Sequence, residues 1–203
     1  LGSLIRYRDA GVWAFEILSG DNMSGPQLRS AFELVRSRVF FGGEMRFHPI
    51  SDLHARTLVE LPEGTLPTIA DDVLHAGWSY EPIERGFAYG YLRIIHGRLD
   101  PASVRPNQIL VTEEVPDDIP VVGALVTSRF QAPLAHVALL SANRHTPDAA
   151  LRDAITDPRV VALEGRLVRL EVTEAGLVLG EATVEDATAH WAAIRPQHPF
   201  SPP

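Results

Sequence analysis

A histidine near the middle of the chain is placed where it could react with phosphorus. His136 lies in the stretch "FQAPLAHVALL" (130–140), three residues after Pro133. Proline suits the first turn of a helix, so this spacing predicts that His136 lies in that turn, beside backbone N–H groups without intrahelical partners. Such donors, with the positive end of the helix dipole, bind phosphate, and an imidazole there can attack phosphorus. The alternative is a histidine that only packs or caps, and local chemistry leaves both interpretations open.

Two arginines and an asparagine near this histidine are candidate phosphate-binding residues. Arg129 precedes the loop, and Asn143 and Arg144 lie seven and eight residues after His136. A guanidinium group matches phosphate oxygens in a bidentate manner. Asn143 is expected on the same helix face as His136, where it could orient the ring or the phosphate. The alternative for both arginines is an exposed, solubilising role.

A metal site is the second chemistry that the histidines suggest. His48 and His54 flank Asp52 in "FHPISDLH", a set that a metal-dependent hydrolase could use. The spacing matches no established zinc pattern, so we expect no metal site. His75 and His96 are expected to be surface residues at the ends of a helix and a strand.

Several common catalytic arrangements are missing from the sequence. The chain has no cysteine, which excludes disulfides, thiolate metal sites and cysteine nucleophiles. It also has no GxxxxGK[ST] phosphate loop and no GxSxG elbow. We therefore expect no nucleotide or other cofactor to be bound by this chain itself.

Composition narrows the class of protein. The net charge of −8 argues against general electrostatic binding of nucleic acid. No apolar run approaches the roughly 18 residues that span a bilayer, and the first residues do not resemble a signal peptide. A cytoplasmic protein without a membrane role is expected. Four of the last eight residues are proline, so 195–203 is predicted to be a tail or linker.

The elements expected around these residues form two parts. Residues 1–85 are predicted to be a small α+β segment of unknown role, with helices at 26–40 and 68–76, the latter capped by Thr68, and strands at 45–50 and 57–61. Residues 86–194 are predicted to be an α/β domain with one core. Its expected strands lie at 86–95, 108–114, 121–127, 159–163, 167–172 and 176–182, and its expected helices at 133–144, 147–155 and 183–194. The last of these begins with the capping pattern "TVED".

The sequence around His136 resembles a known family. The stretch "VVGALVTSRFQAPLAHVALLSANRHTP" (121–147) is similar to the phosphohistidine swivelling domain of the PEP-utilising enzymes, which include phosphoenolpyruvate synthase, pyruvate phosphate dikinase and the glucan water dikinases. In that element a strand ends in a short loop, and a helix begins at the nucleophilic histidine. "LAHVALLSANR" looks especially like the glucan dikinase branch. The looser resemblance of "GYLRIIHGRLDPASVRPNQILVTEEVPDDIP" and "LEGRLVRLEVTEAGLVLGEAT" extends it over residues 86–190.

The resemblance implies a phosphoryl carrier. The expected fold is a swivelling β/β/α domain, and the expected nucleophile is His136. An ATP-grasp domain, on the same polypeptide or a separate subunit, would use ATP and Mg to phosphorylate the histidine, which would pass the group to a small-molecule or glycan acceptor. The chain itself contains no candidate ATP-grasp segment.

Two departures from the family pattern keep an alternative open. Most members carry a pair of hydroxyl residues just before the histidine, where this chain has Leu134 and Ala135, and the preceding Gly-Gly is also missing. The alternative is a non-catalytic module that kept the fold and docks a partner or binds an anion.

Overall fold

In the computed structural model, the chain is described for residues 2–18, 21–116, 118–131 and 136–195, without the side chain of Asp52. Its contacts divide it into two units. One contains residues 1–79 together with 130–139, and the other contains residues 80–129 and 140–203. The sequence-based boundary lay after residue 85. The division falls before Tyr80 because the strand that begins there pairs within the second unit. None of the helices described is long and apolar enough to cross a membrane.

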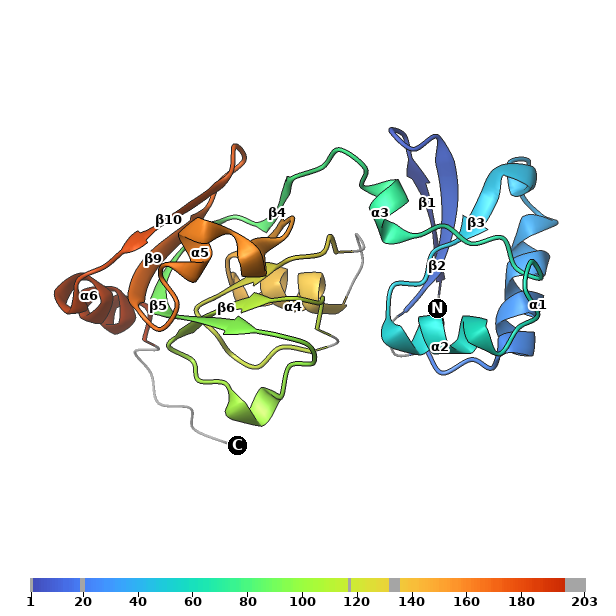
Figure 1. The fold of residues 1–203 in the computed structure, drawn as a ribbon. Coiled ribbons are helices and arrows are strands. Elements are labelled where there is room, and N and C mark those ends of the chain that lie inside the picture. The colour runs from blue at the N-terminus through green and yellow to red at the C-terminus, as the bar shows by residue number, and fades with distance from the viewer. Residues whose placement is uncertain (1, 19–20, 117, 132–135, 196–203) are drawn as a thin grey trace, which may run out of the picture. The chain divides into compact units, whose positions relative to one another are not determined.

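The first unit is built on a three-stranded sheet (Figure 1). Strands β1 (Gly2–Tyr7) and β2 (Val12–Ile17) form an antiparallel hairpin, and β3 (Met45–Phe47) pairs parallel to β2. Helix α1 (Gly25–Arg36) confirms the predicted amphipathic helix, and Ser24 and Gln27 form a capping box at its start. Its Leu28 and Phe32 are fully buried and pack with Phe15, Met45 and Phe47 in one apolar core.

One strand and one helix cap predicted for the first unit were wrong. Residues 57–61 are not a strand, because Ser51 caps a helix, α2 (Asp52–Val59), by accepting from the His54 N–H. His54 and Thr57, three residues apart, are buried on one side of that helix, which is the helical rather than the alternating pattern. The helix expected at 68–76 is a single turn, α3 (Asp71–Leu74), with Ala70 at its N-cap. Thr68 instead forms a bridge with Phe47 beside β3.

The second unit is built on a seven-stranded mixed sheet in the order β10-β9-β5-β6-β7-β8-β4 (Figure 1). Its four central strands run parallel: β5 (Gly86–Ile95), β6 (Gln108–Thr112), β7 (Ala124–Thr127) and β8 (Asp148–Leu151). Strands β9 (Leu167–Val172), β10 (Leu177–Glu181) and β4 (Tyr80–Glu84) add antiparallel at the edges. This mixed α/β architecture confirms the expected class.

Apolar side chains of the central strands form the core of this sheet. Leu92, Ile109, Val126 and Ala149 belong to one buried cluster. Gly90 lets β5 approach β6, because a Cβ there would lie 2.9 Å from the Asn107 carbonyl oxygen. Short 3-10 turns lie at Gly42–Glu44, Pro101–Ser103 and Ala154–Thr156.

Helix α6 (Val184–Ile194) confirms the last predicted helix and its cap. The Thr183 side chain accepts from the Asp186 N–H and donates to its carboxylate. Trp191 Nε1 donates to the Tyr89 carbonyl oxygen at 3.0 Å, which fastens the helix to β5. The predicted tail begins at the end of this helix, and residues 196–203 lie outside the described residues.

Two predictions for the second unit were wrong. Residues 147–155 are not a helix, because Asp148–Leu151 form β8 between β7 and β4. The strand expected at 159–163 is a helical turn, α5 (Pro158–Val161). Asp157 caps that turn by accepting from the Arg159 N–H at 2.8 Å, and Pro158 fits its first position. This Asp-Pro start signal outweighs the β-branched residues that follow it.

Candidate functional site

His136 is the first described residue of helix α4 (His136–Arg144). The helix connects the adjacent parallel strands β7 and β8, so it belongs to a β-α-β unit. The side chain of His136 is exposed, whereas that of the next residue, Val137, is buried. An exposed ring at this point can meet another molecule. Pro133, Leu134 and Ala135, on which the predicted first turn depends, lie outside the described residues.

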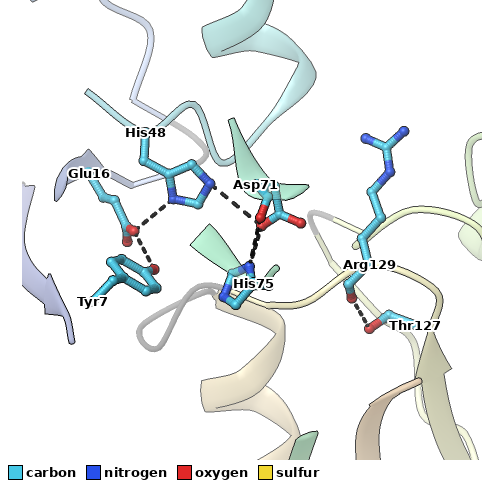
Figure 2. Close-up of polar contacts among 7 residues, drawn as sticks. All are labelled: Tyr7, Glu16, His48, Asp71, His75, Thr127 and Arg129. Atoms are coloured by element: carbon cyan, nitrogen blue, oxygen red, sulfur yellow. Dashed lines mark hydrogen bonds and ion pairs between the residues drawn. The ribbon is translucent and has the colours of Figure 1, made fainter. Parts of the chain in front are cut away.

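Arg129 lies just after β7 and has an exposed guanidinium group. Its backbone is held by the Thr127 hydroxyl, which donates to the Arg129 carbonyl oxygen at 2.7 Å (Figure 2). Its NH2 group lies 3.4 Å from Glu114 Oε1, and the side chains of Arg129 and Glu114 are 61% and 37% exposed. An exposed pair of this kind contributes little to stability, so the guanidinium remains available to an anion.

The other two predicted residues lie at the opposite end of α4 from His136. A rise of about 1.5 Å per residue places Asn143 and Arg144 roughly 10 to 12 Å further along the helix axis. Arg144 NH1 donates to the Ile119 carbonyl oxygen at 2.8 Å, which is a structural contact. The structure thus does not bring these residues to the His136 end of the helix, and contact with a phosphate stays a prediction for both.

The first unit contains a polar network that sequence reasoning missed. It consists of Tyr7, Glu16, His48, Asp71 and His75 (Figure 2). Glu16 Oε1 accepts from the Tyr7 hydroxyl and from His48 Nδ1, both at 2.8 Å. On its other side, His48 Nε2 lies 3.6 Å from Asp71 Oδ1, an ion-pair distance that is too long for a hydrogen bond. The same carboxylate oxygen lies 2.9 Å from His75 Nδ1.

Burial and charge give this network a defined protonation state. Glu16, His48 and His75 are each 2% exposed. Burial lowers the pKa of His48, but its contacts with Asp71 and Glu16 outweigh burial and raise the pKa from 6.5 to about 9. Burial raises the pKa of Asp71, but its contacts with His48 and His75 outweigh burial and hold the pKa well below its usual range. At neutral pH His48 is therefore a cation, and it lies between the side chains of Glu16 and Asp71.

An aromatic cluster adjoins the network in the same unit. The rings of His75 and Phe130 are stacked, with centroids 4.9 Å apart and planes inclined by 26°. Trp78 meets His75 at 5.1 Å and the Phe130 ring edge-on at 5.8 Å. Its Nε1 donates to Asp9 Oδ2 at 3.3 Å. Phe130 is the first residue of segment 130–139, which carries His136 and groups with the first unit.

The structure corrects one histidine prediction and describes two others. His75 is buried rather than a surface residue, and the i,i+4 spacing of Asp71 and His75 was the only local signal of their pairing. His48 and His54 are buried as well. Among the residues whose side chains are described, no group of three or more histidines, aspartates or glutamates is arranged to hold a metal. The side chain of Asp52 lies outside that description.

Exposure distinguishes the histidines that can react with another molecule from those that cannot. The rings of His48 and His75 are buried among carboxylates and aromatic groups, so they can orient neighbouring side chains but are not placed to attack a substrate. His136 is open to solvent. No protein-family model matches the sequence, and no curated protein matches it.

Proposed function

We propose that this chain is the phosphoryl-carrier part of a dikinase-type phosphotransferase, with His136 as the nucleophile. On this proposal residues 86–194 form a phosphohistidine swivelling domain. The donor is ATP with Mg on an ATP-grasp domain, which belongs to the same polypeptide or to a separate cytoplasmic subunit. The acceptor is a small molecule or a glycan.

One observation carries the proposal: His136 is an exposed imidazole at the first described residue of a helix that joins two parallel strands. Helix starts attract phosphate through free N–H groups and the helix dipole. The exposed ring fits a group that must be reached in turn by two different sites. The resemblance of residues 121–147 to the carrier family supports the same role.

The transfer balances in two steps. A ring nitrogen of neutral His136 donates its lone pair to a phosphorus atom of ATP, a P–N bond forms, and a P–O bond of the nucleotide breaks with its electron pair leaving on oxygen. The ring proton on the other nitrogen is free to pass to water. An acceptor hydroxyl then attacks the same phosphorus, the P–N bond breaks with its electron pair returning to the ring, and the hydroxyl proton replaces the one that the imidazole lost. Arg129 is the candidate for balancing the phosphate charge.

The test is label transfer from ATP. The chain is incubated with its cognate ATP-grasp protein and ATP labelled in the β- and γ-phosphates, and the chain is then isolated. The proposal expects one acid-labile, alkali-stable phosphate on the wild type and none on His136→Ala, which should keep the wild-type circular dichroism. Replacement of His145, an exposed histidine at the end of the same helix, by Ala is the matched control and should leave labelling unchanged.

Three results would count against the proposal. If the wild type takes up no label, the non-catalytic docking or anion-binding module becomes the better reading. If His136→Ala is labelled as well as the wild type, another residue is the acceptor. Unfolding of His136→Ala at ordinary temperature would show that the ring has a packing role.

A further inference from the structure

We propose that the polar network and Phe130 form a positioning site for the segment that carries His136, with His75 as the positioning residue. The role assigned to the site, support of phosphoryl transfer, rests on the proposed function above. It gives residues 1–79, for which the sequence suggested no role, a part in presenting the nucleophile.

The plane of the His75 ring is fixed by its surroundings. Its Nδ1–H donates to the Asp71 carbonyl oxygen at 3.2 Å, and Nδ1 lies 2.9 Å from Asp71 Oδ1, an ion-pair contact. Tyr7 packs edge-on against the ring at 5.6 Å. Hydrogen bonds and ring contacts from several directions leave a 2% exposed imidazole only one orientation.

The fixed His75 ring in turn sets the position of Phe130. The two rings are nearly parallel, and Trp78 closes a further side of Phe130. Phe130 is only 5% exposed. An offset aromatic pair of this kind has a preferred geometry as well as an apolar contact, so it fixes the start of segment 130–139 more closely than an aliphatic contact would.

Charge holds the other residues of the polar network in place. The His48 cation lies between Glu16 and Asp71, and Glu16 also accepts from Tyr7. If one member is removed, its partners are left as buried polar or charged groups without a counterpart. Such buried networks are therefore sensitive to single substitutions. A neutral Asn at position 71 would keep the size of the side chain while removing the charge that orients His75.

The test measures amide hydrogen exchange at residues 136–139 in the whole chain. Phe130→Leu keeps an apolar side chain without the ring, and Asp71→Asn keeps the shape without the charge. Both should speed exchange at these amides by about 2-fold to 10-fold, the range that loss of one aromatic contact implies. Asp72→Asn makes the same charge change at an exposed position of the same helical turn, and should exchange as the wild type does.

A variant that restores the aromatic ring distinguishes a positioning role of Phe130 from a general loosening of the fold. Phe130→Tyr keeps the stacked ring and should restore both wild-type exchange and the wild-type rate of label transfer, whereas Phe130→Leu should slow transfer. Wild-type exchange in Phe130→Leu or in Asp71→Asn would overturn the inference, as would equal acceleration in Asp72→Asn. If no variant and no wild type takes up label, phosphoryl carriage fails, and the exchange data still decide whether the positioning site exists.

Discussion

The aromatic ring of Phe130 lies against the His75 imidazole at a centroid distance of 4.9 Å, with 26° between the planes. This stack joins two parts of the sequence for which the primary structure suggested separate roles. One is an N-terminal segment without a recognised motif, and the other is the segment that carries the candidate nucleophile. A contact this specific lets the behaviour of each part be tested through the other.

The first prediction concerns pH and His48. Its pKa is raised from 6.5 in the unfolded chain to about 9 in the fold. The stabilisation is therefore complete below pH 6.5 and is lost as pH rises toward 9. The free energy of unfolding should fall over that window by up to about 3 kcal/mol. Asp71, whose pKa is lowered, stabilises the fold at pH values above its ordinary pKa. It loses that contribution to the free energy of unfolding only as pH falls below the ordinary value.

Chemical unfolding of the wild type between pH 5 and pH 9 checks this slope. His48→Gln should lack it and should be about 3 to 5 kcal/mol less stable near pH 6, because Glu16 remains buried without its cation. His96→Gln changes an exposed histidine and should keep the wild-type slope. Equal slopes in wild type and His48→Gln would contradict the assignment.

The second prediction concerns the two faces of α4. Val137 is 1% exposed and Leu139 is 46% exposed. Val137→Asp should lose several kcal/mol of stability because it buries an unpaired carboxylate. Leu139→Asp makes the same kind of change on the open side and should stay within about 1 kcal/mol of the wild type. Thermal unfolding by circular dichroism measures both, and similar melting temperatures would mean that the buried face of the helix has been misassigned.

The third prediction concerns Arg129. Its pair with Glu114 is exposed, so Arg129→Ala should change stability by no more than about 1 kcal/mol. Loss of a charged hydrogen bond in the transition state should slow phosphoryl transfer by roughly 30-fold to 1000-fold. Arg129→Lys keeps the charge without the planar guanidinium group, so its rate of phosphoryl transfer should lie between those of the wild type and Arg129→Ala. The control Glu114→Gln should transfer at the wild-type rate, and unchanged transfer in Arg129→Ala would remove this residue from the site.

The fourth prediction separates Arg144 from Asn143. The guanidinium group of Arg144 donates to the Ile119 carbonyl oxygen, so Arg144→Ala should lower stability by about 1 to 2 kcal/mol. Asn143→Ala, at the adjacent exposed position, should change it by less than about 0.5 kcal/mol. Urea unfolding gives both values. If Arg144→Ala keeps its stability and transfers slowly, the residue acts on the phosphate rather than on the fold.

Local signals in the sequence were sufficient for much of the fold. Helices α1 and α6 have capping residues next to them in sequence, and the stretches that form β6 and β7 are rich in β-branched residues and are followed by turn or helix signals. The prediction of β8 failed because Asp148 and its neighbours become a strand only by pairing with β7 and β4, which lie far away in the chain. The prediction of α2 failed because the short stretch 57–61, which is bounded by Pro62, was interpreted as a strand without regard to the Ser51 cap upstream of it.

The candidate site also contains residues that local sequence signals indicate and residues that only long-range pairing brings together. Pro133, three residues earlier, made His136 a candidate nucleophile, and only the family resemblance favoured that role over packing. Glu16 and His48 meet only because β3 pairs with β2, where the His48 N–H donates to the Phe15 carbonyl oxygen at 3.0 Å. The side chains of Tyr7 and Asp71 join them from β1 and α3. No spacing within the sequence encodes those meetings, so the network could not have been predicted from it.

The grouping of residues 130–139 with the first unit has a consequence for the order of synthesis. Domains generally fold as units, beginning with the N-terminal one, as the chain leaves the ribosome. Here the first unit has its sheet and helices after residue 79, but the Phe130 ring that stacks on His75 is made only after strands β4 to β7 of the second unit. Until then the His75 face of the nascent unit lacks its aromatic cover. A ribosome stalled before residue 130 should therefore carry a first unit that is folded but more open to proteases near Trp78 than the finished protein.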